Sequence, residues 1–203
     1  MNLVAFGPHA VLVECGSLAG AVSVAARLRT PPLDGVDDVV AAARTVLIRG
    51  LQGWVEIAVL VEERLRGWTP ETEVVATRPT VQIRVRYDGE DLASVAAASG
   101  LTVAAVVDLH ATARYTVAFC GFAPGFAYLV GLPAALVLPR RRTPRTVVPA
   151  GSVAIAGEFS AVYPTPSPGG WHLLGHTSQT MFDPRDEPPA LLTPGAGVRF
   201  EAT

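Results

Sequence analysis

Two kinds of hydrophobic pattern alternate along the first third of the chain. Short apolar runs rich in β-branched residues have the length of strands, whereas Trp54, Ile57 and Val61 recur at the spacing of one helix face. Ser17 is suited to cap a further helix, which ends at Thr30 and the two prolines after it. The resulting order, β-α-β-β-α-β, is that of a split βαβ motif. The expected elements are strands at Ala10–Glu14, Val36–Ala41, Thr45–Ile48 and Glu73–Thr77 and helices at Leu18–Leu28 and Trp54–Leu65.

A different pattern begins near residue 79, where we place a domain boundary. Val81–Tyr87 alternates apolar and polar side chains, as a half-buried strand does. Two short helices follow; Gly100 ends the first, and Thr102 caps the second, which carries His110 on its apolar face. The remainder consists of short apolar runs joined by turns. We therefore predict the α+β class, with a small α+β domain over residues 1–78 and a β-barrel domain over residues 79–203.

Composition narrows the class of function. The formal net charge of -2 provides no attraction to nucleic acid or to an acidic membrane surface. All 16 basic residues are arginine, which excludes a Schiff-base lysine and a lysine-containing phosphate loop. The two cysteines, Cys15 and Cys120, lie among apolar residues and are expected to be packing residues. Neither a secretion signal nor an apolar run of membrane-spanning length is visible, so a cytoplasmic location is expected.

Four arginines within six positions are the strongest charge signal. Arg140, Arg141, Arg142 and Arg145 lie in a run bracketed by prolines, which restrict its conformations. A guanidinium group binds carboxylate or phosphate through two parallel hydrogen bonds. We expect Arg142 and Arg145 to act on an anionic ligand; the alternative is a solvated loop that only keeps the surface soluble.

A glycine-rich aromatic segment, Gly121–Leu129, indicates a small-molecule pocket, because such pockets are apolar with a few placed polar groups. The Tyr128 hydroxyl would orient a substrate amide or carboxylate. Filling of the barrel core is the simpler explanation for Phe122 and Phe126. The expected substrate contacts in this segment are Gly121, Phe122, Pro124 and Gly125.

The segment Ser167–Trp171 contains two consecutive glycines. Gly169 and Gly170 would either present backbone N–H groups to an anion or form a hairpin turn. After them, His172 and His176 would share one face of a strand, which suggests a general base or a metal pair. We expect no metal, because no nearby carboxylate or histidine motif provides further ligands. We expect His176 to make a polar contact with the substrate.

Two other polar residues are weaker candidates. His110 is a candidate catalytic residue, and a hydrogen-bonded core histidine is the alternative. Ser152 lacks the strand-to-helix turn of a serine nucleophile, so it is expected at most to contact substrate. We expect the arginine run, the Tyr128 segment and Gly170 to converge on one cavity at a mouth of the barrel.

Four motifs in one order resemble the KipI / PxpB family, also called allophanate hydrolase subunit 1. They are Gly121–Leu129, Pro139–Arg145, Val148–Val153 and Ser167–Trp171, and the likeness extends over nearly the whole chain. Arg142, Arg145 and His110 match positions of the family pattern. His176 and Ala196 depart from it, since the family has arginine and an acidic residue at these positions.

The resemblance implies a cyclophilin-like barrel and a role as the PxpB-type component of an ATP-dependent 5-oxoprolinase. Such a complex hydrolyses 5-oxo-L-proline to L-glutamate, and the chain would be active only with partner subunits. The implied partners are a sister chain like allophanate hydrolase subunit 2 (PxpC) and a LamB/YcsF-type subunit (PxpA). ATP, with Mg, would enter at the level of the complex.

Two other functions fit the same family. One is an inhibitor that binds a sensor histidine kinase, as the name KipI implies. The other is the carboxyltransferase component of a biotin-dependent enzyme acting on urea or a related amide. In the second case a partner would carry biotin, because this chain has no lysine for it.

Overall fold

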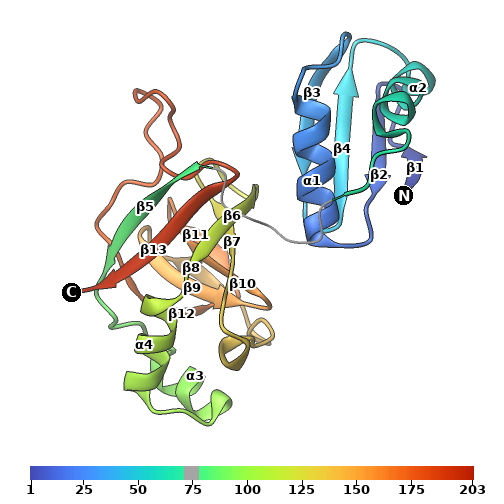
Figure 1. Ribbon diagram of the computed structural model, residues 1–203. Helices are drawn as coiled ribbons and strands as arrows, with labels where there is room; N and C mark the ends of the chain where they lie inside the picture. The colour runs from blue at the N-terminus through green and yellow to red at the C-terminus, as the bar shows by residue number, and fades with distance from the viewer. Residues whose placement is uncertain (71–77) are drawn as a thin grey trace. The chain divides into compact units, whose positions relative to one another are not determined.

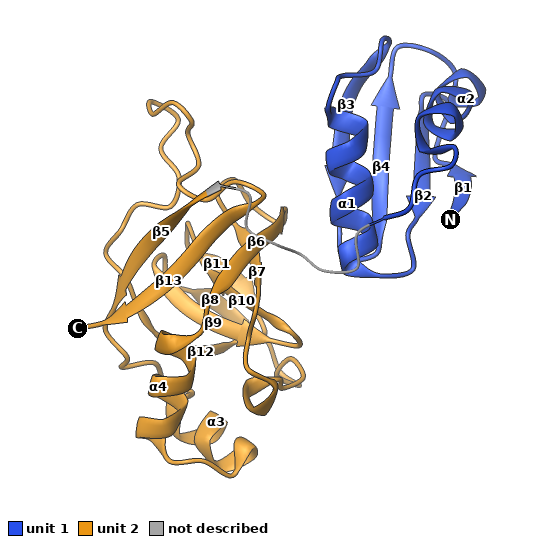
Figure 2. Cartoon of the chain, in the orientation of Figure 1, with its two compact units in different colours: residues 1–74 blue, residues 75–203 orange. Residues whose placement is uncertain are grey.

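The chain forms two compact units, Met1–Val74 and Val75–Thr203, in a computed structural model that describes residues 1–70 and 78–203 (Figures 1 and 2). The predicted strand Glu73–Thr77 lies outside the described residues, and so does the junction of the units. The boundary expected at residues 78 and 79 therefore stays a prediction.

In its described part, unit 1 is an antiparallel four-stranded sheet in the order β1-β2-β4-β3. Helix α1 connects β2 to β3, and β4 lies between those two strands, which is the predicted split βαβ arrangement. On its other side β2 pairs with the edge strand β1, which the hydrophobic pattern did not predict. The elements are β1 (Asn2–Ala5), β2 (Ala10–Glu14), α1 (Leu18–Arg29), β3 (Val36–Ala41), β4 (Thr45–Gly50) and α2 (Trp54–Leu65).

The core of unit 1 lies between the sheet and its two helices. The Ser17 hydroxyl accepts a hydrogen bond from Gly20 N–H at 3.1 Å, so it caps α1 as predicted. Helix α2 buries one face through Ile57, Val61 and Leu65, which recur at helical spacing. The apolar periodicity of the sequence therefore identifies the face of α2 that packs on the sheet.

Unit 2 is built on a strongly curled seven-stranded sheet in the order β12-β9-β10-β7-β6-β13-β5. Arg86 follows one edge strand and His176 ends the other, and their backbones exchange hydrogen bonds of 2.9 and 2.8 Å. These bonds join the two edges of the sheet, so the predicted α+β chain with a barrel-like second unit is confirmed. The strands are β5 (Arg78–Val85), β6 (Tyr115–Cys120), β7 (Ala127–Val130), β8 (Arg145–Val148), β9 (Ser152–Ala156), β10 (Phe159–Val162), β11 (Ser167–Gly169), β12 (His172–His176) and β13 (Ala196–Ala202).

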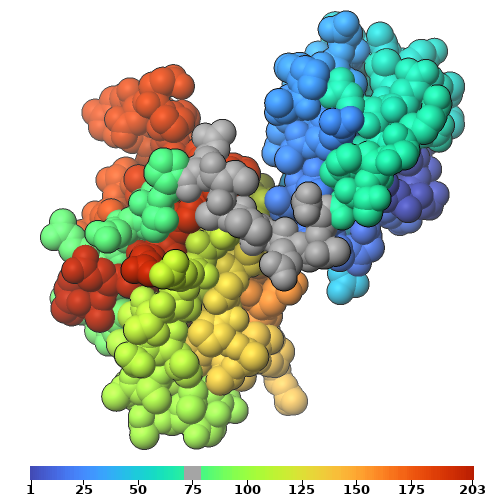
Figure 3. All heavy atoms as spheres, viewed as in Figure 1, coloured from blue at the N-terminus to red at the C-terminus, as the bar shows by residue number. Residues whose placement is uncertain are grey.

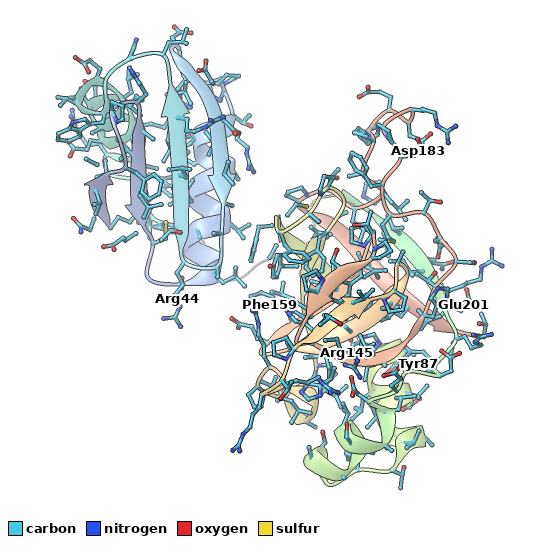
Figure 4. All side chains as sticks on the ribbon, turned by 180° about the vertical axis from the view of Figure 1, so that it is seen from behind. Arg44, Tyr87, Arg145, Phe159, Asp183 and Glu201 are labelled. Carbon is cyan, nitrogen blue, oxygen red and sulfur yellow. The ribbon has the colours of Figure 1, made fainter. Side chains whose placement is uncertain are left out.

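Two helices follow β5 in unit 2, and they are α3 (Leu92–Ser99) and α4 (Val103–Thr112). Gly100 ends α3 in the left-handed conformation, and the Thr102 hydroxyl caps α4 at Ala105 N–H, both as predicted. A short 3-10 turn, η1 (Ala134–Leu136), precedes the arginine run. The segment between β12 and β13 projects from the surface of unit 2 as a separate lobe that carries Asp183 (Figures 3 and 4).

Among the described residues, no single helix is long and apolar enough to cross a membrane. Helices α3 and α4 together reach the required length and composition, but they are bent by 93° at the break between them. Both helices bury apolar side chains inside unit 2, where Leu92, Val95 and Val106 share one core cluster.

Candidate functional site

Three of the motifs line one small cavity in unit 2. The cavity has a volume of about 90 Å³ and lies where the loop before β7, the arginine run and the loop after β11 meet. Of the predicted convergence, the structure shows Tyr128, Gly170 and one arginine of the run, Arg140, at this cavity. The lining residues are Phe122, Phe126, Tyr128, Arg140, Tyr163, Pro168, Gly169, Gly170 and Trp171.

Phe126 is the centre of the aromatic wall of the cavity. It is buried, and its ring makes edge-on contacts with Tyr128, Tyr163 and Trp171 at centroid distances of 5.1, 5.3 and 5.6 Å. Edge-to-face aromatic packing of this kind is attractive and directional. The wall is therefore held by mutual contacts, and it presents two phenol groups and an indole ring.

Phe122 lies at the rim of the cavity. Its side chain is 60% exposed, so the expectation that it fills the barrel core is wrong, whereas Phe126 is a core residue as expected. Its backbone φ is 73°, a left-handed conformation that costs a bulky residue about 1–3 kcal/mol. Hydrogen bonds of the turn hold this conformation, from Ala123 N–H to Gly121 O and from Phe126 N–H to Ala123 O. The turn therefore keeps an aromatic ring exposed at the opening.

Among the predicted glycine contacts, only Gly169 and Gly170 line the cavity. A Cβ atom at Gly169 would lie 2.2 Å from the Tyr163 hydroxyl oxygen, so this close approach requires glycine. Gly125 is needed for a different reason, because a Cβ there would lie 2.6 Å from Phe182 Cβ. Gly121 and Pro124 are exposed in the turn and do not line the cavity.

Arg140 is the cation of the cavity. Burial raises the pKa of the Tyr128 and Tyr163 hydroxyls, and the positive charge of Arg140 partly opposes this rise. Both phenols are therefore protonated at neutral pH and can donate hydrogen bonds. The sequence placed Arg140 in the run but favoured two of its neighbours.

Arg145 is held in an ion-pair cage and does not line the cavity. It donates from Nη1 to Asp91 Oδ2 at 2.9 Å, and from Nη2 to Asp91 Oδ1 and Glu90 Oε2 at 3.0 Å each. Arg141 also pairs with Asp91. Burial alone would raise the pKa of Asp91, but the hydrogen bonds and charges of these arginines lower it below its usual value.

Arg142 is exposed, and within residues 1–70 and 78–203 it makes no hydrogen bond or ion pair. The structure thus divides the four arginines into three environments. Arg140 lines the cavity, Arg141 and Arg145 are tied to a buried carboxylate, and Arg142, which is exposed like Arg140, does not line the cavity. The prediction that Arg142 and Arg145 together form the anion site does not agree with this placement.

His110 is a neutral histidine in the core of unit 2. Its Nδ1 lies 2.7 Å from the Tyr87 hydroxyl and its Nε2 lies 2.9 Å from Ser160 Oγ. Ser160 Oγ donates its only proton to Ala154 O, so Nε2–H is a donor and Nδ1 accepts from Tyr87. Burial lowers the pKa of His110 to about 3. It does not line the cavity. Its surroundings are those of the alternative interpretation, a hydrogen-bonded core histidine.

The remaining predicted residues also lie outside the lining. Ser152 is buried, and its hydroxyl donates to Pro149 O at 2.8 Å. A register shift between Leu173 and Gly175 interrupts the regular alternation of β12 on which the pairing of the two histidines depended. His172 contacts Pro139 O through Nε2, and His176 is exposed at the strand end.

Sequence reasoning missed Tyr163, Pro168 and Trp171 as lining residues. Tyr163 begins the proline-rich loop that leads into the Ser167–Trp171 motif. This closeness in sequence was the signal that could have identified it. Among the described residues, no group of three or more His, Cys, Asp or Glu side chains is arranged to hold a metal ion.

Comparison with known proteins places this chain in a family. Residues 1–192 match the family model described as carboxyltransferase domain, subdomain C and D. The B subunit of 5-oxoprolinase from Escherichia coli O157:H7 is 47% identical over 160 residues, which are 77% of this chain and 72% of the relative.

Solved structures share the fold of this chain. TTHA0988 superposes with a TM-score of 0.80 at 36% identity over 96% of this chain, which spans only 40% of that protein. Kluyveromyces lactis urea carboxylase, at 18% identity and a TM-score of 0.73, covers 99% of this chain and shares the fold, while this chain covers 21% of it. The chain therefore belongs to the carboxyltransferase subdomain C and D family, the KipI / PxpB family that its four motifs predicted.

Proposed function

We propose that the chain is the PxpB-type component of an ATP-dependent 5-oxoprolinase complex, which hydrolyses 5-oxo-L-proline to L-glutamate. Relatives that are 44–48% identical are named as the B subunit of 5-oxoprolinase, which supports this function. The single observation that carries the proposal is the cavity itself. An aromatic wall with one cation and two phenol donors suits a small five-membered lactam that bears one carboxylate.

Each part of 5-oxo-L-proline has a matching group in the cavity. The guanidinium of Arg140 binds the carboxylate, since it is the lining residue with a positive charge. The ring lies against the aromatic faces around Phe126. Tyr128 and Tyr163 donate hydrogen bonds to the lactam carbonyl, where negative charge develops when the amide is attacked.

ATP does not fit this cavity. A volume of about 90 Å³ is well below the 300–1,000 Å³ typical of pockets for larger ligands. The chain also has no lysine, which excludes a lysine-containing phosphate loop. We therefore assign ATP and its Mg to the assembled complex, at a site to which the partner subunits contribute. The proposed partners are the PxpC-like sister chain and the LamB/YcsF-type PxpA subunit, and the proposed location of the complex is the cytoplasm.

The first experiment measures glutamate release from 5-oxo-L-proline by the chain alone, by the two partner subunits together, and by all three proteins. The proposal predicts ATP-dependent release only from the three-protein mixture. Full activity of the lone chain would contradict the shared site, and no activity of the mixture would contradict the proposed substrate.

A second candidate function is supported by the family model and by the fold shared with urea carboxylase. In that function the chain contributes to a carboxyltransferase that acts on urea or a related amide with a biotin-carrying partner. A mixture of the chain and its sister chain with a biotin carboxylase and a biotin-carrying protein, supplied with ATP, labelled bicarbonate and urea, distinguishes the two, because only a carboxyltransferase incorporates the label into the amide.

A further inference from the structure

Asp91 occupies the position of a helix cap but does not cap its helix. An aspartate before the first residue of a helix usually accepts a hydrogen bond from a backbone N–H of the first turn. At α3 the Asp91 side chain makes no such bond. Its carboxylate instead turns towards the arginine run and β12, and the residue is only 3% exposed.

Four donors converge on this buried carboxylate. Arg145 binds both oxygens, at 2.9 Å to Oδ2 and 3.0 Å to Oδ1, and Arg141 binds Oδ1. The fourth donor is the backbone N–H of Leu173, at 2.8 Å from Oδ2. A single side chain therefore ties together three segments that are far apart in the sequence.

The tied segments are those that carry the cavity. Arg141 N–H donates to Gly170 O at 2.8 Å, and Arg145 is paired with Gly169 in the ribbon formed by β8 and β11. Gly169, Gly170 and Arg140 line the cavity, and Arg140 is the direct neighbour of Arg141. Residues Pro139–Pro144 form no regular strand or helix, so fixed contacts at Arg141 and Arg145 determine their path.

We propose that Asp91 is a positioning residue of this cavity, which holds the arginine run so that Arg140 reaches the ligand carboxylate. The identity of the ligand rests on the proposed function, whereas the claim that Asp91 holds the arginine run does not. Without the carboxylate, the charges of Arg141 and Arg145 would repel each other. The hydrogen bond from Arg141 N–H to Gly170 O would then break. Arg140, an exposed lining residue next to Arg141, would then no longer be held at the cavity by its neighbouring backbone.

The structural test compares Asp91→Asn with Glu90→Gln in the purified chain by hydrogen exchange of backbone amides. Both acids contact Arg145, but Glu90 has an exposed side chain, so it is the matched control. The amides of Arg141 and Leu173 should exchange at least about 10-fold faster in Asp91→Asn, and at the normal rate in Glu90→Gln. Normal exchange of both amides in Asp91→Asn would overturn the proposal.

The functional test measures KM and kcat for 5-oxo-L-proline in the three-protein mixture. Asp91→Asn should raise KM about 10-fold or more with kcat nearly unchanged, because the ligand carboxylate loses its oriented partner. A fall in kcat alone at constant KM would indicate loss of folded protein and would overturn the proposal. Arg145→Gln should give the same KM effect, and it provides the test if Asp91→Asn does not fold.

The two tests separate this proposal from the proposed function. If the mixture with the unchanged chain does not act on 5-oxo-L-proline, the proposed function fails while the hydrogen-exchange result still decides the role of Asp91. If the mixture is active and Asp91→Asn leaves both KM and the two amides unchanged, only the positioning role fails.

Discussion

The Tyr163 hydroxyl lies directly over Gly169, so closely that a Cβ atom at residue 169 would be 2.2 Å from its oxygen. The neighbouring Gly170 also lines the cavity, yet a Cβ there would meet no atom closer than 3.6 Å. Two adjacent glycines thus differ in what a methyl group would meet. This difference provides a matched pair of variants.

Gly169→Ala should lower the free energy of unfolding by about 1–3 kcal/mol, because Tyr163 must move out of a packed aromatic cluster. Gly170→Ala should change it by less than about 0.5 kcal/mol, since the added methyl group is in ordinary contact. Urea denaturation monitored by tryptophan fluorescence measures both. Equal effects of the two variants would show that Tyr163 does not occupy this position in solution.

Phe122 and Phe126 should respond differently to substitution. Phe122→Asn removes an exposed ring and places a residue that tolerates positive φ, so the free energy of unfolding should stay constant or rise by up to about 1 kcal/mol. Phe126→Ala should lower it by about 3–5 kcal/mol because it opens a cavity in the core. A large destabilisation by Phe122→Asn would contradict the exposed position of the ring.

The buried imidazole of His110 should make unit 2 less stable in mild acid. Its pKa is lowered to about 3 in the folded chain. In the unfolded chain the imidazole has its ordinary pKa of about 6.5 and is protonated at any pH below that value. The unfolded state therefore binds more protons between these values, so stability falls as pH decreases through this window and is independent of His110 above it. The slope due to His110 is at most about 1.4 kcal/mol per pH unit.

Nitrogen NMR of the histidine side chains tests this directly. The His110 ring should keep the spectrum of a neutral imidazole, protonated at Nε2, at pH 5. A His110 ring that becomes charged between pH 6 and 7 would show that the ring is accessible to water.

The elements that local sequence determines were predictable. Ser17 and Thr102 cap helices as expected, and the spacing of Ile57 and Val61 identified the buried face of α2. Strand β1 was missed because most of its residues are exposed, so it lacks the apolar alternation of a half-buried strand.

The roles within the arginine run were not predictable from local sequence. All four side chains have the same chemistry, and they differ only in what the fold places opposite them. Asp91, which is about 50 positions away in the chain, takes Arg141 and Arg145, and this leaves Arg140 to face the cavity. Likewise, the register shift in β12 changes the relation between His172 and His176 without a signal in composition.

The most direct test of the account compares Arg140→Gln with Arg142→Gln in the assembled complex. Arg140 should contribute a charged hydrogen bond to the substrate carboxylate, so its loss should raise KM for 5-oxo-L-proline by about 10- to 100-fold. Arg142→Gln should leave KM within about 2-fold, because Arg142 does not line the cavity. A larger rise in KM for Arg142→Gln than for Arg140→Gln would contradict the assignment of Arg140 as the cation of the site.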